Sequence, residues 1–388
     1  MGPSGPFQGL NVMKIVIDDK IPFIRGVFEP YAQVVYLPGA STAADDVRDA
    51  DALITRTRTK CNASLLEGSS VKIVFTATIG FDHIDTQWCE SNGIIWRSAP
   101  GCNSGSVRQY IAAALVTLCD RYGLNFKEVT LGVVGVGNVG SKVASVAGAM
   151  GMKVLLNDPP RERREGSDGF SSLDDIIGNC NIITLHVPMQ KTGPDVTWHL
   201  FDGRTFDRMG KGAILINSSR GAVVSNSDLK EALASGKIRA AALDVWESEP
   251  APEPELVSLL DITTPHIAGY SADGKANGTA AAVRGVAEVL GIESLKEWNV
   301  PSVPGPDVNT EFSVNVAGLS FQQTITKAIL HTYDIGKDSD ALRFSLESFE
   351  KLRGSYPIRR EFEAFTVRLE NGTEEERTAL GKIGFRVI

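Results

Sequence analysis

The chain has 388 residues and a formal net charge of −8, and 43% of its residues are hydrophobic. This length allows two or three domains, and the composition is that of a globular protein with a sizeable core. The acidic balance, without a dominant basic cluster, argues against nucleic acid as the main partner. The longest apolar run, residues 110–119, is too short to cross a membrane, so we expect no membrane partner.

The cysteines and the first residues of the chain bear on its location and its natural start. An odd number of scattered cysteines favours reduced thiols in the cytoplasm over disulfides or a zinc site, so no metal is expected.

Residues 1–12 are rich in glycine and proline, and a natural first strand begins at Met13. We therefore expect residues 1–12 to be an added leader. The five cysteines are Cys61, Cys89, Cys102, Cys119 and Cys180.

Short apolar runs alternate with polar or amphipathic segments over the first hundred residues. This alternation predicts βαβ units and a parallel sheet, in a first α/β domain that lacks a glycine-rich motif. The expected strands are residues 14–17, 34–37, 52–54, 71–75 and 94–96. A long helix over residues 103–122 then leads into a second α/β domain. Its expected strands are residues 131–134, 153–156, 182–185, 213–217, 240–243 and 261–263.

The second domain opens with a glycine motif between a strand and a helix. Gly135, Gly137 and Gly140 form the pattern G-x-G-x-x-G. The first glycine permits a tight turn, the second lets a pyrophosphate approach the backbone, and the third lets helix and strand pack closely. A lone motif of this kind can be an ordinary turn, but the order of strand, motif, helix and strand predicts a dinucleotide site.

Residues beside the motif complete this predicted cofactor site. The helix N-terminus presents the N–H groups of Asn138 and Val139 to the phosphates. Asp158 lies 18 positions after Gly140, where a carboxylate can bind the ribose hydroxyls. A carboxylate there repels a 2′-phosphate, so the expected cofactor is NAD rather than NADP. Arg161, Arg163 and Arg164 follow closely and are interpreted as a solvated loop.

The remaining pattern divides the chain into domains. A helix over residues 274–290 is expected to return to the first domain, and residues 301–306 read as a linker. Helical periodicity recurs at 321–330 and 341–352. About 80 residues fold alone only marginally, which favours an oligomerisation module over an appendage packed on its own chain. The expected domains are residues 13–102 with 280–300, residues 103–279, and residues 301–388.

Three ionisable residues follow predicted strands of the second domain. Arg220, Glu249 and His266 each lie a few residues beyond a strand. Ligands of open parallel sheets bind outside the carboxyl ends of the strands, so these side chains are candidates for one site. Taken singly, each has a plainer interpretation, such as a loop histidine, an acid in an acidic run, or an arginine that binds a cofactor phosphate.

These segments, with Gly135–Gly140 and Pro100-Gly-Cys-Asn103, closely resemble the D-isomer-specific 2-hydroxyacid dehydrogenases over residues 13 to about 300. The resemblance implies an α/β fold with two doubly wound parallel-sheet domains. These are a flavodoxin-like substrate domain (13–102 and 280–300) and a Rossmann NAD domain (103–279). It also implies a small C-terminal α+β dimerisation domain, and hence a homodimer.

Within the family, three features single out one branch: the short interval between Glu249 and His266, the run Gly269-Tyr270-Ser271, and the C-terminal domain. They are most similar to members that oxidise 4-phospho-D-erythronate at C2. The product is (R)-3-hydroxy-2-oxo-4-phosphobutanoate, in vitamin B6 biosynthesis. The alternatives are a dehydrogenase of D-3-phosphoglycerate or another D-2-hydroxy acid, and an NAD-sensing binding protein that resembles the dehydrogenase-like corepressors.

The catalytic roles follow from chemistry together with the resemblance. Oxidation of a 2-hydroxy acid requires removal of the hydroxyl proton while a hydride leaves C2, and histidine suits the proton step. His266 is therefore the expected base. Glu249 should orient its ring and favour its protonated form. Arg220 should bind the substrate carboxylate through its planar guanidinium.

The remaining contacts are implied by the resemblance. It implies that Ser218, Asp244 and Gly269 contact the cofactor, Asp244 through the nicotinamide carboxamide. A phosphorylated substrate also needs a second anion site. Arg56 and Arg58 would share one face if their strand continues, although they could instead be an exposed edge. The positions that match substrate contacts are Thr57, Thr78 and Tyr270.

Two stretches depart from the family pattern. Residues 105–109 are more polar than the usual small apolar run, with Gln109 where a glutamate is usual. Val187 stands where a threonine often contacts the cofactor. No side-chain contact to the cofactor is therefore expected from Val187.

Overall fold

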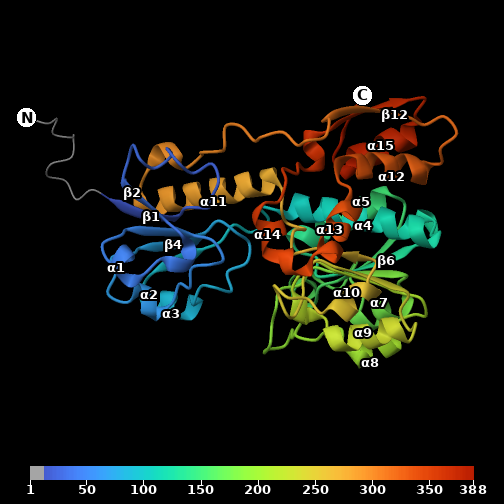
Figure 1. Ribbon diagram of the computed structural model, residues 1–388, viewed down its shortest axis with the longest axis horizontal. Helices are drawn as coiled ribbons and strands as arrows, with labels where there is room; N and C mark the ends of the chain where they lie inside the picture. The colour runs from blue at the N-terminus through green and yellow to red at the C-terminus, as the bar shows by residue number, and fades with distance from the viewer. Residues whose placement is uncertain (1–12) are drawn as a thin grey trace, which may run out of the picture. The chain divides into compact units, whose positions relative to one another are not determined.

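A computed structural model describes residues 13–388 (Figure 1). The expected leader, residues 1–12, lies outside the described residues. The chain divides into two compact units. One contains the residues up to Asn103 and Ala272–Val303, and the other contains Ser104–Ser271 and Pro304–Ile388. The first unit therefore resumes at Ala272 rather than at 280, because the helix that begins there runs unbroken to Leu290.

The first unit is built on a parallel sheet of five strands in the order β2-β1-β3-β4-β5. This is the flavodoxin-like order that the resemblance implied. Its strands are β1 Lys14–Asp18, β2 Gln33–Leu37, β3 Ala52–Thr55, β4 Ile73–Thr76 and β5 Ile95–Arg97. Its helices are α1 Ala44–Val47, α2 Ala63–Leu66, α3 Thr86–Ser91 and α11 Ala272–Leu290.

Two glycines let α11 lie directly against this sheet. A Cβ atom on Gly278 would stand 2.4 Å from the carbonyl oxygen of Ala77, and one on Gly285 would stand 2.2 Å from the Phe75 ring. Larger residues at either position would push the helix away from β4. The small side chains of this segment thus serve close packing.

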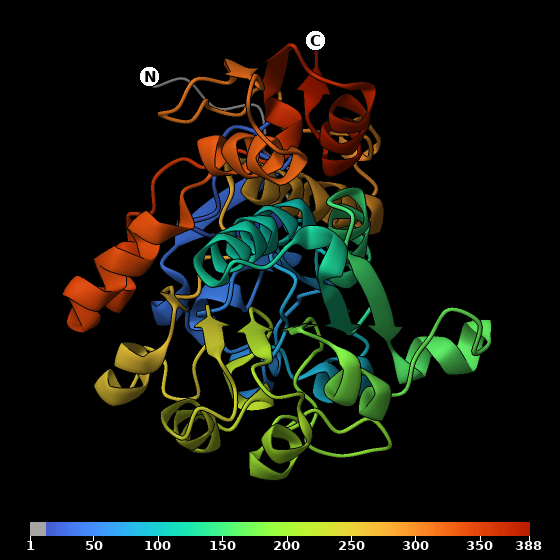
Figure 2. The same ribbon diagram turned by 90° about the vertical axis from the view of Figure 1, so that its right-hand side faces the viewer.

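The second unit contains a parallel sheet of six strands in the order β11-β10-β9-β8-β6-β7. Helices α4 and α5 cover one face and α7 to α10 the other, as Figures 1 and 2 show. The strands are β6 Thr130–Val134, β7 Lys153–Asn157, β8 Ile182–Leu185, β9 Ile214–Asn217, β10 Ala240–Leu243 and β11 Ile262–Thr263. The helices are α4 Ser104–Tyr122, α5 Asn138–Ala149, α6 Pro159–Glu165, α7 Leu173–Asn179, α8 Gly203–Arg208, α9 Asn226–Ala234 and α10 Pro254–Leu259.

The C-terminal residues belong to this second unit and share its core. Val314, Ile325 and Phe362 lie in the same apolar cluster as the buried side chains of α4 and α5. Three parallel strands form a small separate sheet in the order β12-β13-β14. These elements are β12 Glu311–Asn315, α12 Phe321–Thr332, α13 Ile335–Phe344, α14 Phe349–Gly354, β13 Thr366–Glu370, α15 Glu374–Ile383 and β14 Arg386–Val387.

The helix expected over residues 341–352 is not continuous. Helix α13 ends at Phe344, Ser345 is not helical, with φ −152° and ψ 89°, and α14 begins at Phe349. Leu342 and Phe349 are both buried in one cluster, so their spacing of seven residues imitates helical periodicity across the break. The pattern identified the buried side chains correctly but missed the turn between them.

The polar stretch 105–109 of α4 is the surface on which the C-terminal residues dock. The Arg108 guanidinium donates to both carboxylate oxygens of Glu363 at 2.7 Å. Gln109 donates to Thr332 Oγ1 and to the carbonyl of Arg360. Buried donors need such partners. The contacts with the C-terminal residues therefore explain why residues 105–109 are more polar than is usual in the family.

Candidate active site

The strands of the second unit end in one row. Their register places Val134 opposite Asn157 and Leu185, Leu185 opposite Asn217, Asn217 opposite Leu243, and Leu243 opposite Thr263. Since all six strands are parallel, the residues that follow them emerge at the same edge of the sheet. Those residues include Gly135, Asp158, Ser218, Asp244 and Thr264.

The three motif glycines differ in their steric surroundings. Gly135 has φ +88°, in the left-handed region that favours glycine. A Cβ atom on Gly140 would stand 1.9 Å from the carbonyl oxygen of Gly135, so only glycine lets α5 approach the turn. Gly137, at the start of α5, is exposed, and a Cβ atom there would meet no protein atom within 4 Å. The open side of Gly137 fits a pyrophosphate bound on the backbone.

A substitution of Gly137 separates folding from cofactor binding. We expect Gly137→Ala to unfold at the wild-type temperature, since the protein leaves room for the methyl group. We expect NADH binding to weaken about tenfold or more, because the methyl group occupies the side from which the pyrophosphate approaches. Fluorescence titration measures the affinity. Gly148→Ala, at another open position of α5, is the control and should change neither property; unaltered affinity in Gly137→Ala would contradict the assignment.

Asp158 follows β7 and is held in place by backbone N–H groups. Its Oδ2 accepts from Val136 at 2.8 Å, and its Oδ1 accepts from Arg161 at the start of α6 at 2.9 Å. The Arg161 side chain in turn donates to the carbonyl of Val136. The carboxylate is thereby fixed beside the glycine turn and keeps further lone pairs for ribose hydroxyls.

His266 and Glu249 form a hydrogen-bonded pair at the ends of β11 and β10. The His266 Nδ1 lies 2.8 Å from Glu249 Oε2, and Glu249 Oε1 accepts from the N–H of Trp246 at 3.0 Å. His266 has φ +57°, a conformation that costs about 1–3 kcal/mol in a residue other than glycine. Such strain persists only where the surroundings fix the loop.

The environment of Glu249 keeps it ionised. Burial would raise the pKa of this carboxyl group. The hydrogen bond and charge of His266, the N–H of Trp246 and the charge of Arg353 together outweigh burial, so its pKa lies below the ordinary value. An ionised carboxylate beside the imidazole is the arrangement that orients a catalytic histidine.

The lowered pKa of Glu249 predicts how stability depends on pH. A carboxyl group whose pKa is lowered by folding stabilises the protein above its unfolded pKa, here 4.5, and loses this effect as the pH falls through the folded value. We therefore expect the stability lost in Glu249→Gln, relative to the wild type, to be present at pH 5 and to shrink as the pH falls below 4.5, because the wild-type carboxylate then becomes protonated. Urea unfolding measures this difference, and a difference that grows as the pH falls below 4.5 would contradict the pairing.

Arg220 follows β9 in a loop that packs against the loop of Glu249. The carbonyl of Arg220 accepts from Asn217 Nδ2 at 2.9 Å, and its guanidinium donates to the carbonyl of Ser219. A Cβ atom on Gly221 would stand 2.0 Å from the carbonyl oxygen of Trp246. Glycine at 221 therefore lets the loops that carry Arg220 and Glu249 lie in direct contact.

The three further cofactor candidates lie at the same strand ends. Ser218 has a buried Oγ atom without a partner among the described residues, as expected of a group that bonds a ligand. Asp244 is almost fully buried, and its oxygens accept from Thr264 Oγ1 and the N–H groups of Ile267 and Ala268. These hydrogen bonds of Asp244 hold the loop of His266. The contact with nicotinamide that the resemblance implies for Asp244 would come in addition to them. Gly269 is partly exposed in the same loop.

The substrate candidates of the first unit also follow neighbouring strands. Strand β3 ends at Thr55 and a turn follows, so the condition under which Arg56 and Arg58 would share a face, a continuing strand, is not met. Arg56 is partly buried and donates to the carbonyl of Lys20, whereas Thr57 and Arg58 are exposed. Thr78 follows β4, the neighbour of β3.

Tyr270 brings in side chains that the sequence did not indicate. Its ring packs edge-on against Tyr356 and lies 5.9 Å from the Arg353 guanidinium, both in the C-terminal segment. Arg353 is also the residue whose charge acts on Glu249. The sequence assigns these residues to the C-terminal domain but not to the site, because their proximity to Tyr270 depends on how the C-terminal residues dock.

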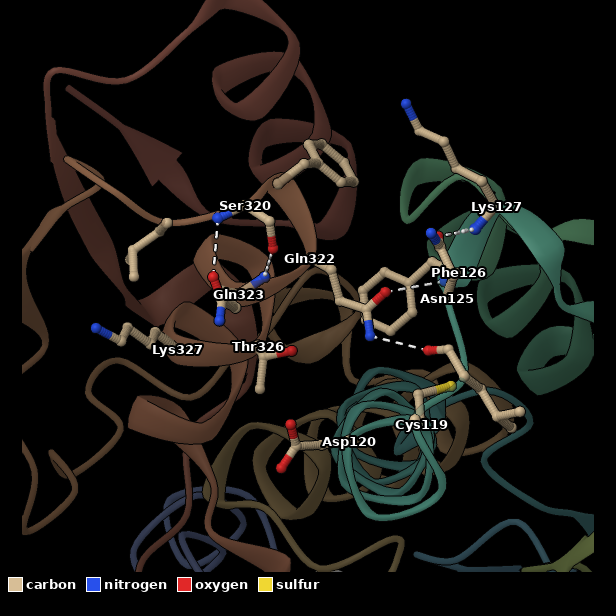
Figure 3. A pocket seen from close by; sticks show the side chains of 14 residues that line it. Cys119, Asp120, Asn125, Phe126, Lys127, Ser320, Gln322, Gln323, Thr326 and Lys327 are labelled. Carbon is tan, nitrogen blue, oxygen red and sulfur yellow. Dashed lines mark hydrogen bonds between the residues drawn. The ribbon is translucent and has the colours of Figure 1, made fainter.

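A wide pocket elsewhere in this unit does not carry the chemistry. It lies between the end of α4 and the start of α12, where Gln322 bonds the backbone of Leu124 and Phe126 (Figure 3). Its lining contains none of the predicted site residues and no paired acid and base. The row of strand ends, which holds a histidine paired with a carboxylate and an arginine in the adjacent loop, is the better candidate.

Comparison with known proteins agrees with this geometry. Residues 108–268 match the family described as D-isomer specific 2-hydroxyacid dehydrogenase, NAD binding domain. The solved structure of Aquifex aeolicus D-lactate dehydrogenase, complexed with NAD and lactic acid, has a TM-score of 0.61 and 26% identity, and covers 75% of this chain and 100% of that chain. The chain therefore belongs to the D-isomer-specific 2-hydroxyacid dehydrogenase family and is an NAD-dependent dehydrogenase.

Its curated relatives define the branch of the family. Erythronate-4-phosphate dehydrogenase of Bacteroides fragilis is 48% identical over 356 residues, covering 92% of this chain and 99% of the relative. The enzyme of the same name from Escherichia fergusonii is 38% identical over 379 residues, covering 97% and 99%. These relatives confirm the predicted resemblance. Residues 305–384 match a domain of unknown function, DUF3410.

Proposed function

We propose that this dehydrogenase oxidises 4-phospho-D-erythronate at C2 to (R)-3-hydroxy-2-oxo-4-phosphobutanoate, in the synthesis of pyridoxal 5′-phosphate. The observation that carries the proposal is the hydrogen-bonded His266–Glu249 pair at the same sheet edge as Arg220 and the glycine turn. The high identity to erythronate-4-phosphate dehydrogenases supports the choice of substrate.

Each residue of the site has a defined part in the proposed reaction. The Arg220 guanidinium binds the C1 carboxylate and thereby orients the C2 hydroxyl. His266 Nε2 removes the hydroxyl proton while Nδ1 stays bonded to Glu249, whose charge stabilises the imidazolium that forms. NAD, when bound, accepts the hydride from C2. Tyr270, Thr57 and Thr78 are proposed substrate contacts, and Arg56 and Arg58 are proposed to bind the phosphate.

A panel of substrates tests the proposal. Purified protein is assayed with NAD and a 2-oxo acid that reoxidises tightly held NADH. The expected order of kcat/KM is 4-phospho-D-erythronate first, with D-erythronate and D-3-phosphoglycerate far below. Faster oxidation of D-3-phosphoglycerate would move the assignment to that alternative. Binding of NADH without turnover of any 2-hydroxy acid would favour an NAD-sensing protein.

We also propose that the protein is a cytoplasmic homodimer that associates through its C-terminal domain. Five free cysteines suit a reducing compartment. Among the described residues no helix is long and apolar enough to cross a membrane. Phe344 at the end of α13 is 93% exposed, so its apolar side chain is available for contact with a second copy of the chain.

The exposed phenylalanine allows a test of dimer formation. We expect Phe344→Ser to weaken self-association at least tenfold, measured by sedimentation equilibrium, because the apolar side chain no longer leaves water on association. Phe81→Ser, at a 44% exposed position of the first unit, is the matched control and should leave association unchanged. Wild-type association in the Phe344 variant would place the interface elsewhere.

A further inference from the structure

The loop that carries His266 is held from two sides by opposite charges. On one side, Asp244 accepts hydrogen bonds from the N–H groups of Ile267 at 2.8 Å and Ala268 at 2.9 Å. On the other side, Arg359 donates through Nη2 to the carbonyl of Ala268 at 2.6 Å and that of Ile267 at 3.2 Å. In the two residues after His266, the N–H groups are therefore held by the buried Asp244 and the carbonyl groups by the buried Arg359.

Arg359 belongs to the C-terminal domain and is built into a dedicated buried site. Only 5% of its surface is exposed, and its guanidinium carbon lies 4.3 Å from the centre of the Tyr333 ring. The hydroxyl groups of Tyr333 and Tyr356 both donate to Asp338 Oδ2, at 2.8 and 2.7 Å. This aromatic and acidic surround compensates the buried cation, which would otherwise be costly.

Helix α4 supplies a third member of this arrangement. Arg359 Nη2 also donates to Ser106 Oγ at 2.6 Å, and Ser106 Oγ donates to the carbonyl of Ala268 at 2.9 Å. The same network reaches the proposed substrate contact Tyr270, because its ring packs edge-on against Tyr356. The C-terminal domain therefore bears on both His266 and Tyr270.

We propose that Arg359 is a positioning residue for the dehydrogenase reaction: it clamps the 267–268 backbone against Asp244 and so holds His266 in its left-handed conformation, paired with Glu249. This inference rests on the proposed role of His266 as the base. It gives the C-terminal domain a part in catalysis within its own chain, separate from association. A backbone with φ +57° at His266 relaxes when its neighbours are released, and the ring then leaves the orientation required for proton transfer.

Substitution of Arg359 tests the clamp. We expect Arg359→Met to lower kcat about 100-fold while KM and NADH affinity change less than about threefold, since a displacement of about 1 Å of a catalytic group costs this much. Arg359→Lys should recover about a tenth of the wild-type rate, because one ammonium group can still donate to the carbonyls. Equal kcat values in the Met variant and the wild type would overturn the proposal.

The matched control is Arg108→Met, which breaks another buried arginine contact between α4 and the C-terminal domain. It loosens the docking without touching the His266 loop, so its kcat should stay within about threefold of wild type, since only misplaced catalytic groups incur the larger loss. An equal loss in both variants would mean that docking in general matters and that Arg359 has no special role. If Arg359→Met does not fold, Ser106→Ala is tested instead, since it removes the hydroxyl group that bonds both Arg359 and the carbonyl of Ala268. It should lower kcat without changing KM, and an unchanged kcat would overturn the proposal.

Hydrogen exchange separates the clamp from the assigned chemistry. In the wild type, the N–H groups of Ile267 and Ala268 are bonded to Asp244 and should exchange slowly. Exchange in the segment 264–270 should be faster in Arg359→Met and unchanged in Arg108→Met. If exchange is faster in Arg359→Met but kcat is unchanged, the position of His266 does not determine the rate. If exchange is unchanged in Arg359→Met, Arg359 does not hold this backbone in place.

Discussion

Replacement of His266 by asparagine is expected to lower kcat by about 10²–10⁴-fold, the usual contribution of general acid–base catalysis. Asparagine keeps a polar group near Glu249 but cannot accept the hydroxyl proton. NADH affinity should stay within about threefold of wild type, because His266 is assigned to proton transfer and not to cofactor binding. Steady-state kinetics and fluorescence titration measure the two quantities.

The chain supplies a matched control for this experiment. His199 and Glu247 form a second histidine–carboxylate pair, 2.6 Å apart, in the same unit. His199 lies outside the row of strand ends, so His199→Asn should leave kcat nearly unchanged. An equal loss of kcat in both variants, or a loss of less than tenfold in His266→Asn, would contradict the assignment of His266 as the base.

Replacement of Arg220 by glutamine should lower kcat/KM about 10²–10³-fold, since truncating one partner of a close charge pair costs about 2–5 kcal/mol. The kcat/KM of Arg220→Lys should lie between those of the wild type and Arg220→Gln, because lysine keeps the charge but not the planar pair of donors. NADH affinity distinguishes the two roles considered for Arg220. Unchanged affinity supports a contact with the substrate carboxylate, whereas a parallel loss of affinity would place Arg220 on a cofactor phosphate.

The fold of both α/β units follows closely from the sequence. Parallel strands buried on both faces are continuous apolar runs, so their positions stand out within one or two residues. The glycine motif was equally clear in the sequence, because Gly135 and Gly140 meet steric demands that no other residue satisfies. Arg220, Glu249 and His266 were proposed because loops after adjacent parallel strands emerge at one edge and because their segments resemble the family.

What the sequence did not indicate depends on contacts between distant segments. The sequence assigns Arg353 and Arg359 to the C-terminal domain, and only the docking of that domain on α4 brings them to Tyr270 and the 267–268 backbone. The break at Ser345 was missed because buried residues on either side keep a helical spacing.

The proposed function depends on transfer of the hydride from C2 of 4-phospho-D-erythronate to NAD at this site. The most direct measurement is a single turnover with substrate deuterated at C2, followed by mass spectrometry of the NADH that forms. We expect the NADH to carry the deuterium and the rate to fall relative to unlabelled substrate. Unlabelled NADH, or deuterium retained in the product, would contradict this transfer.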